Sequence, residues 1–450
     1  MTTITNFFNN DYITFAAYDN TRKIPNICDG LKTSQRKVLY TILKNNIDSE
    51  QKEIKVEQLS AKASEQTCYL HGANSLNGVA VGMACKYTGS NNINILEPDG
   101  NFGTRFVKES SAPRYIYTYL SNIAKYIFKK EDESILDEQT FEGQKIEPKV
   151  YYPIIPMTLI NGAQGLSVGF SCNISPRNPL EIIEWLEYRL KNKKYNKDLL
   201  PHFNNFGGTI EKKDDKYILK GKFKKITSSK LIITEIPIKY SLKQYLNILD
   251  DLCERDIIKS YNDYSNNDKF NFEVKVKLNF FDNKTDEDIL KTLKLTESIT
   301  DNFVLLDKNG KIKEYSNIEE ILEEYYKIRY NIYNKRNQFQ LNEIEQQIIL
   351  NNNKKLFIEC VLNNIINIKD SLNNIKNKME SLNFQKIDNS YDYLLNMKIS
   401  SLTKDKLDEL KNKIQVMDNV KKILLNTTIE EVWLQELKDL KKIIIKENII

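Results

Sequence analysis

Glycine and proline are unevenly distributed along the 450-residue chain, and this distribution constrains the fold more than any other feature. All 15 glycines lie at or before Gly310, and all 10 prolines lie at or before Pro237. The last 140 residues therefore lack both of the residues that most often end a helix. Apolar side chains recur there at spacings consistent with a heptad: Ile321, Tyr325, Ile328, Ile332 and Phe339. This pattern predicts two long antiparallel helical arms with a break near 383–389 and a small helical region over 391–411. An ordinary helical bundle would share it.

The first 130 residues are expected to be mostly helical with turn-rich connections. The Asp29-Gly30 pair predicts a turn followed by an amphipathic helix, and a second helix is expected over 74–87. Gly78 and Gly82 cost this second helix about 1 kcal/mol each relative to alanine. Their presence is explained if another helix or a nucleic-acid groove approaches the backbone closely. Two successive short helices in a basic segment are similar to a helix-turn-helix arrangement, although many core helices share it.

The chain between residues 145 and 280 differs in composition and pattern. It opens with a loop rich in proline and glycine and continues with strand-like runs around one helix. We expect strands over 208–211, 217–219, 231–235 and 272–278, and the helix over 242–253. The sequence thus predicts a multidomain α+β protein, divided into residues 1–130, 131–300 and 301–450.

The net charge is concentrated in the first of these parts. Residues 1–130 carry 16 Lys and Arg side chains and 11 Asp and Glu side chains, which accounts for the whole formal charge of +5. A basic excess is expected where a segment meets a polyanion, but a solvated surface can also carry five charges without a function.

Several motifs that would indicate other functions or compartments are missing from the sequence. No run approaches the ~18 apolar residues of a membrane helix, and the N-terminus lacks a secretory signal. Six cysteines without a Cys-x-x-Cys pair favour free thiols and a cytoplasmic protein, and two histidines argue against an intrinsic zinc site. We find neither a phosphate-cradling glycine loop nor an acidic group suited to two catalytic metals, so ATP or Mg²⁺ chemistry would need another polypeptide.

One heptapeptide, residues 111–117, places Arg114 directly beside Tyr115. Apolar residues at positions 116, 120, 123 and 127 predict a helix that begins near Tyr115, with Pro113 in its first turn. A tyrosine phenol has a reference pKa of about 10, so it needs nearby positive charge to react as a phenolate near neutral pH. Arg114 would supply that charge and could also bind a phosphate. A tyrosine in an apolar helix is more often a packing residue, and the heptapeptide alone leaves both interpretations open.

Short motifs occur in a fixed order over nearly the whole chain. They lie at residues 19–25, 29–39, 69–72, 89–92, 100–105, 114–115, 154–156, 161–162, 165–169, 235–237, 393–397 and 433–434. This ordered set resembles the breakage-reunion part of type IIA DNA topoisomerases. The length looks most like the medium subunit of the tailed-phage enzyme, and the chain is also similar to the gyrase A subunit core and the C-terminal half of eukaryotic topoisomerase II. The resemblance implies a winged-helix DNA-gate domain, an α/β tower domain, and long antiparallel coiled-coil arms with a small helical dimerisation region.

The resemblance also implies roles for individual residues. Tyr115 matches the nucleophile that attacks a DNA phosphate and becomes linked to the 5′ end, and Arg114 matches an arginine that stabilises the transition state. Arg22 matches a second arginine near the scissile phosphate, and His71 matches a histidine that hydrogen-bonds or relays a proton there. The residues implied to contact DNA are Lys32, Arg36, Lys37, Ser75, Arg105 and Leu166, the last as an apolar wedge between base pairs.

The partners and cofactors follow from the same resemblance. It implies a homodimer that cleaves double-stranded DNA so that a second duplex can pass, as part of an ATP-hydrolysing type II DNA topoisomerase, an isomerase. Mg²⁺ and ATP would be bound mainly by an ATPase and metal-binding partner, with no metal ligands on this chain. If the chain is phage-encoded, it would act in the bacterial host cytoplasm. Two other hypotheses stay open: a DNA-bending architectural dimer without cleavage, and a tyrosine recombinase that links to the 3′ phosphate.

Overall fold

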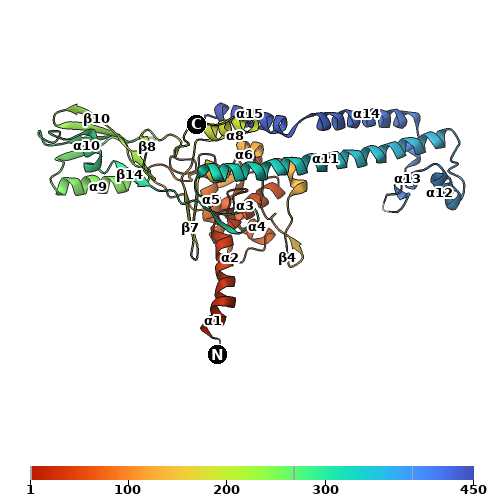
Figure 1. Ribbon diagram of the computed structural model, residues 1–450, viewed down its shortest axis with the longest axis horizontal. Helices are drawn as coiled ribbons and strands as arrows, with labels where there is room; N and C mark the ends of the chain where they lie inside the picture. The colour runs from red at the N-terminus through yellow and green to blue at the C-terminus, as the bar shows by residue number, and fades with distance from the viewer. Residues whose placement is uncertain (1–2, 267–268, 388, 450) are drawn as a thin grey trace. The chain divides into compact units, whose positions relative to one another are not determined.

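The computed structural model describes residues 3–266, 269–387 and 389–449. Contacts divide the chain into two compact units, Met1–Asn331 with Trp433–Ile450, and Ile332–Val432. Helices and strands are mixed along the chain, which confirms the multidomain α+β class (Figure 1). The finer division at residues 130 and 300 stays a prediction. Among the described helices, none has the length and apolar character needed to cross a membrane.

The second unit is helical, as the lack of glycine and proline predicts. Its helices are α11 (Ile318–Leu362, which begins in the first unit), α12 (Leu372–Ser381), α13 (Asp392–Leu395) and α14 (Lys404–Asn426). The 45-residue α11 and the returning α14 run antiparallel. Lys421 pairs with Glu345 at 3.0 Å. Further along, Asn351 donates a hydrogen bond to the sulfur of Met417 at 3.5 Å.

The small helical region expected over 391–411 is only partly right. Residues 404–411 belong to the long returning helix α14, and the compact part instead includes α12 and the end of α11. Its core gathers apolar side chains from both sides of the expected break: Phe357, Cys360, Ile366, Met379, Phe384 and Leu394.

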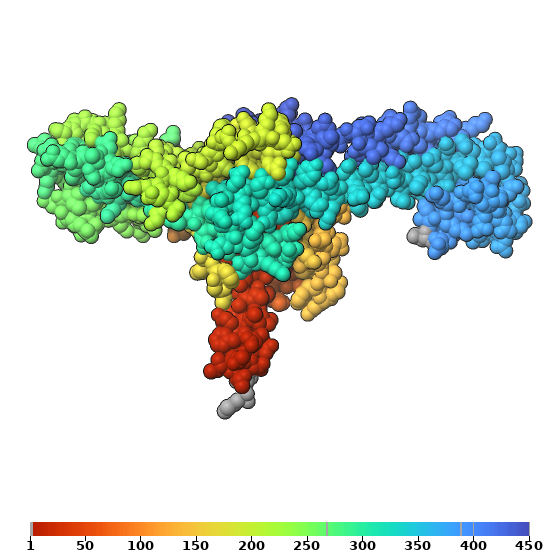
Figure 2. Space-filling model, viewed as in Figure 1, coloured from red at the N-terminus to blue at the C-terminus, as the bar shows by residue number. Residues whose placement is uncertain are grey.

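The first unit begins with a helical group packed on a small sheet. The helices are α2 (Ile13–Lys23), α3 (Thr33–Lys44), α4 (Val56–Gln66) and α5 (Ala73–Ala84), and the strands are β1 (Ile54–Lys55), β2 (Leu96–Asp99) and β3 (Tyr117–Leu120). The sheet is antiparallel with the order β1-β3-β2. A helical group with such a sheet is the arrangement of a winged-helix domain. The short α1 (Ile4–Asn6) and η1 (Phe7–Tyr12) extend α2 away from the rest of this unit, as the red segment in Figure 2 shows.

The helix predicted to begin at Tyr115 is wrong. Tyr115 lies in a turn, and the chain then forms β3, the central strand of the sheet, before the short helix α6 (Asn122–Ile127) begins. Ile116, Thr118 and Leu120 are buried and alternate with less buried tyrosines, which is the period of a strand. The apolar residues spaced by 4, 3 and 4 positions looked like one helix, but they belong to two elements: the first two to the strand region and the last two to α6. The aromatic and β-branched composition of the run was the better signal.

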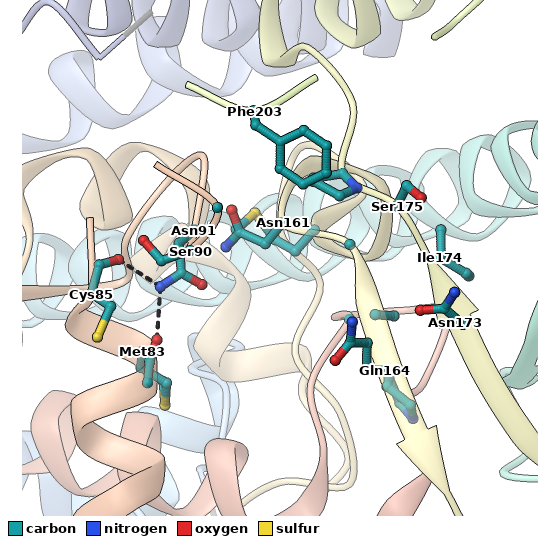
Figure 3. A pocket seen from close by; sticks show the side chains of 18 of the residues that line it. Met83, Cys85, Ser90, Asn91, Asn161, Gln164, Asn173, Ile174, Ser175 and Phe203 are labelled. Carbon is teal, nitrogen blue, oxygen red and sulfur yellow. Dashed lines mark hydrogen bonds between the residues drawn. The ribbon is translucent and has the colours of Figure 1, made fainter. Parts of the chain in front are cut away.

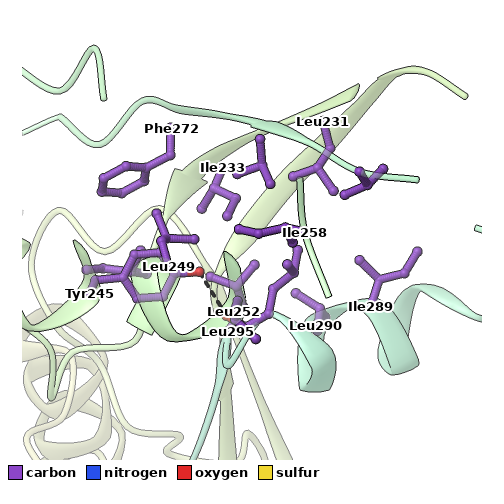
Figure 4. Close-up of a cluster of buried hydrophobic side chains, with 14 of the residues drawn as sticks. Leu231, Ile233, Tyr245, Leu249, Leu252, Ile258, Phe272, Ile289, Leu290 and Leu295 are labelled. Atoms are coloured by element: carbon purple, nitrogen blue, oxygen red, sulfur yellow. Dashed lines mark hydrogen bonds between the residues drawn. The ribbon is translucent and has the colours of Figure 1, made fainter. Parts of the chain in front are cut away.

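The middle of the first unit is the expected α+β region. It contains β8 (Thr209–Lys213), β9 (Lys216–Lys220), β10 (Lys222–Thr227), β11 (Lys230–Glu235), α9 (Leu242–Glu254), β12 (Ser260–Asp263), β13 (Phe272–Lys275), α10 (Asp286–Thr292) and β14 (Thr296–Ile299). These strands form two sheets, with the orders β10-β11-β13-β12 and β14-β9-β8. Leu231, Tyr245, Phe272 and Leu295 are among the buried side chains that join the first sheet to α9 and α10 (Figure 4). Strand β10 was not expected, because its three lysines interrupt the run of apolar and β-branched residues that indicates a strand.

The remaining elements lie wholly or, in the case of α15 (Ile429–Lys446), mostly in the first unit. They are β4 (Thr140–Phe141), β5 (Gln144–Lys145), α7 (Met157–Ile160), β6 (Ala163–Leu166), β7 (Ser171–Ile174), α8 (Pro179–Leu190), β15 (Val304–Leu306), β16 (Ile312–Glu314) and α15. Short 3₁₀ turns lie at Glu50–Lys52, Lys130–Ile135 and, in the second unit, Ile399–Ser401. The hairpin of β6 and β7 is the one that carries Leu166.

Candidate functional site

Tyr115 is an exposed side chain on the turn that leads into β3. Its backbone N–H donates to the carbonyl of Ala112 at 2.9 Å, which closes the turn. The side chain is 71% exposed, whereas the next residue, Ile116, is buried beneath it. The guanidinium carbon of Arg114, which is also exposed, lies 5.8 Å from the centre of the Tyr115 ring. The turn therefore presents the phenol and a positive charge to solvent together, and the packing interpretation of Tyr115 does not hold.

A second group joins α2 to the start of α5. Nη1 of Arg22 lies 3.1 Å from Nδ1 and 2.7 Å from Nε2 of His71, and the hydroxyl of Tyr18 lies 2.8 Å from the same Nε2. An arginine can only donate hydrogen bonds. The shorter of the two contacts therefore makes Nε2 the acceptor of the Arg22 N–H, because a hydrogen on Nε2 would face that N–H at 2.7 Å. The Tyr18 hydroxyl then also donates its hydrogen to Nε2, at 2.8 Å.

The structure brings the expected catalytic residues together as two pairs. Arg22 contacts His71, and Arg114 contacts Tyr115; among the described residues no hydrogen bond links one pair to the other. Sequence reasoning missed Tyr18, although it precedes Arg22 by four residues and so shares its helix face.

Leu166 stands at the tip of the β6–β7 hairpin with 77% of its surface exposed. The tip is a tight turn in which Ser167 donates from both its N–H and its hydroxyl to the carbonyl of Phe170, at 2.9 and 3.2 Å. Gly169 supports this turn with a φ of +79°, a conformation that side chains rarely adopt. Phe170 is 45% exposed, so the hairpin presents two large apolar groups to solvent.

Lys32 is one of the residues that line a cavity of about 590 Å³, together with Gly82 and Met83 of α5. Burial lowers the pKa of the half-buried Lys32 ammonium and of the Lys108 ammonium, and Lys108 donates to the carbonyl of Ile238 at 3.0 Å. Figure 3 shows amide and hydroxyl side chains around this cavity, among them Asn91, Gln164 and Ser175. In the described part of the chain, no ion pair involves Lys32, so its charge is available to an anion.

The exposed face of α5 is open. A Cβ added at Gly78 or at Gly82 would meet no atom within 4 Å. No other described helix therefore packs against these two glycines, which leaves their backbone accessible from outside the chain. Ser75, which is exposed in the first turn of α5, donates its hydroxyl hydrogen to the carbonyl of Gly72 at 2.9 Å.

Three of the residues expected to contact DNA are instead buried and bonded within the chain. Arg36 donates to the carboxylate of Asp29 at 2.8 and 3.1 Å, and Lys37 pairs with Glu147 at 2.8 Å. Arg105 is 2% exposed and donates to the carbonyls of residues 236, 237, 238 and 240. The burial of Arg36, Lys37 and Arg105, whose charges are bonded within the chain, speaks against the direct DNA contacts that the resemblance implied for them.

The described residues contain no group of three or more His, Cys, Asp or Glu side chains close enough together to hold a metal ion. The six cysteines are all free.

Comparison with known proteins gives consistent matches. The model of the family that comprises the A subunits of DNA gyrase and topoisomerase IV matches residues 22–438. The mitochondrial DNA topoisomerase 2 of Dictyostelium discoideum is 33% identical over 99% of this chain and 35% of its own length. DNA topoisomerase 2 of Invertebrate iridescent virus 6 is 35% identical over 98% of this chain and 39% of its own length. The chain thus spans a little over a third of these curated relatives.

A solved structure is similar over nearly the whole chain. It is described as the DNA-binding, cleavage and re-ligation domain of Plasmodium falciparum topoisomerase II. It matches with a TM-score of 0.87 at 32% identity, over 99% of this chain and 65% of that chain.

Proposed function

Since the chain belongs to the family of DNA gyrase and topoisomerase IV A subunits, we propose that it is the DNA cleavage and religation part of an ATP-dependent type II DNA topoisomerase. The observation that carries the proposal is the exposure of the Tyr115 phenol beside the Arg114 guanidinium. Two copies of the chain would each cut one strand of a duplex, so that a second duplex can pass through the break.

The chemistry is a reversible exchange of phosphate esters. The Tyr115 oxygen attacks a backbone phosphorus, and the bond from phosphorus to the 3′ oxygen breaks. The DNA 5′ end is then a phosphotyrosyl ester, and the freed 3′ oxygen takes up a proton. Because a phenolate leaves more easily than a sugar alkoxide, the 3′ hydroxyl can attack in return and restore the strand without ATP.

The two pairs of residues have separate tasks in this reaction. Arg114, and Arg22 from the second group, stabilise the negative charge that grows on the phosphoryl oxygens. His71, held between Arg22 and Tyr18, moves the proton. Mg²⁺ and ATP would be bound mainly by an ATPase and metal-binding partner, and Mg²⁺ would supply positive charge next to the phosphate.

The DNA contacts that we propose are fewer than the sequence implied. Lys32, with its unpaired charge, binds a backbone phosphate, and Ser75, which is exposed in the first turn of α5, makes a second contact. Leu166 inserts between base pairs and bends the duplex. The six free cysteines support a location in a reducing cytoplasm.

The test is to trap cleaved DNA. The chain is mixed with its ATPase and metal-binding partner, Mg²⁺ and supercoiled plasmid, and the reaction is stopped with denaturant. We expect protein-linked DNA with wild type and with the control Tyr117→Phe, and none with Tyr115→Phe. An adduct in the Tyr115→Phe reaction refutes the assignment. A 3′ linkage would indicate a recombinase, and bending without any adduct would indicate an architectural protein.

A further inference from the structure

The β6–β7 hairpin, which carries the proposed wedge Leu166 at its tip, is hydrogen-bonded to α2, the helix that carries Arg22. The backbone N–H of Val168, at the hairpin tip, donates to Oδ2 of Asp19 on α2 at 3.1 Å. Oδ1 of the same carboxylate pairs with Nζ of Lys23 at 2.9 Å. Asp19 is 6% exposed, whereas most of the preceding residues in the N-terminal segment are exposed. Its hydrogen bond with Lys23 lowers the pKa of the Asp19 carboxyl, so the acceptor is ionised at neutral pH.

A second contact fixes the hairpin to the same end of α2. A Cβ added at Gly165 would lie 2.6 Å from the carbonyl oxygen of Lys23 and 3.2 Å from Cδ1 of Ile24. Only a glycine permits this approach without a shift of the backbone. The hairpin therefore touches α2 on both sides of its exposed leucine, through Gly165 before Leu166 and through Val168 after it.

The same short helix holds the second group of the site. Asp19 precedes Arg22 by three residues, a rise of about 4.5 Å along one helical turn. Tyr18 and Arg22 on this turn both contact His71. The hairpin tip is thus bonded to the same end of α2 that presents Tyr18 and Arg22 to His71.

From this arrangement we propose that Asp19 is a positioning residue that couples insertion of Leu166 into DNA to the placement of Arg22 and His71 at the scissile phosphate. The proposal rests on the function proposed above. Insertion of the wedge moves the turn that contains Val168, and the buried carboxylate carries that movement to α2. Strand cleavage then depends on bending of the duplex and not on binding alone.

A double-mutant cycle tests the coupling. Bending is measured by energy transfer between dyes on the two ends of a duplex, and cleavage by covalent adduct in the complete enzyme. We expect Asp19→Ala to bind and bend DNA within about twofold of wild type but to lower adduct formation by roughly tenfold. Leu166→Ala should lower both bending and adduct in the wild-type background. In the Asp19→Ala background it should cause less than about a twofold further loss of adduct.

Two further variants separate coupling from folding. Asp19→Asn keeps an oxygen that can accept the Val168 N–H, so it should retain most of the adduct, and it tests the idea even if Asp19→Ala fails to fold. Asp11→Ala removes the same charge from an exposed position on the preceding segment, and its effect should simply add to that of Leu166→Ala.

The possible failures are distinguishable. Additive losses for Asp19 and Leu166, or an Asp19→Ala protein that loses binding, bending and adduct together, overturn the coupling and leave the proposed function intact. If the Leu166→Ala protein bends DNA normally, Leu166 does not act as a wedge between base pairs, and the proposed coupling is refuted as well. A wild-type enzyme without adduct overturns the proposed function itself.

Discussion

Arg105 tests whether a buried basic side chain in this chain stabilises the fold and does not bind DNA. The sequence places it in a motif with an implied DNA contact, whereas the structure buries it. We consider Arg105→Met, which keeps most of the length of the side chain and removes its charge. The guanidinium donates four hydrogen bonds at 2.6 to 3.3 Å, to carbonyl oxygens between residues 236 and 240. It also lies 5.2 Å from the ring centre of Phe270.

The expected destabilisation is large. Each hydrogen bond from a charged donor contributes about 1.5–3 kcal/mol, but removal of the guanidinium also removes the cost of burying it. Loss of one member of a buried charged contact typically costs about 3–5 kcal/mol, because the remaining polar groups stay buried without a partner. We therefore expect Arg105→Met to lower the free energy of unfolding by about 3–5 kcal/mol.

The assay combines urea unfolding with DNA binding at several salt concentrations. Arg105→Met should unfold at a lower urea concentration, and while still folded it should keep the wild-type slope of log K against log salt. Lys32→Met is the matched contrast: its stability should stay within about 0.5 kcal/mol, and its slope should become less steep by about 0.9. If Arg105→Met is as stable as wild type and lowers the slope by about one, Arg105 contacts a phosphate and the reasoning from its burial is refuted.

Three further outcomes are expected. Tyr18→Phe should lower adduct formation without changing DNA affinity, because His71 loses a hydrogen-bond partner; Tyr12→Phe, on the same segment, is the control, and an unchanged adduct yield would contradict a role of Tyr18 in holding His71. Gly78→Ala should stabilise the free protein by about 1 kcal/mol in thermal unfolding, since nothing occupies the added Cβ position, but should weaken DNA binding; unchanged affinity would mean that DNA does not approach α5. Hydrogen bonding with Asp99 raises the pKa of the Glu53 carboxyl above its ordinary 4.5, so the favourable protonated state is present at low pH and is lost as pH rises through the raised pKa. Glu53→Gln should therefore stabilise the protein more at pH 8 than at pH 4, and equal effects at both pH values would contradict this.

The elements that could be predicted from the sequence are those set by local pattern. The helix α3 follows from its apolar side, with Val38, Leu39 and Ile42 all fully buried, and the 45-residue α11 follows from the absence of helix breakers. The exposure of Tyr115 could not be predicted in the same way. It depends on Ile116 entering the core beside Gly100, where an added Cβ would come within 2.9 Å of Ile116.

Long-range partners account for the errors among the basic residues. Glu147, which neutralises Lys37, lies 110 residues away in sequence, and the carbonyls that surround Arg105 lie more than 130 residues away. No local pattern distinguishes such a lysine from one on a solvated helix face. Even Asp29, only seven residues before Arg36, looks from the sequence like a turn residue and not like an ion-pair partner.

The basic side chains that are available to a nucleic acid are those without an acidic partner in the chain. Arg36 and Lys37 are matched by carboxylates, and Arg105 is surrounded by carbonyls. In the part of the chain that the structure describes, Arg22, Lys32 and Arg114 have no acidic partner within salt-bridge distance. A cation without an acidic partner attracts an anion more strongly than one whose charge is already neutralised within the chain. The formal charge of the segment therefore matters less for DNA binding than which of its cations the fold leaves without an acidic partner, and Arg22 and Arg114, which stand beside His71 and Tyr115, are two of these.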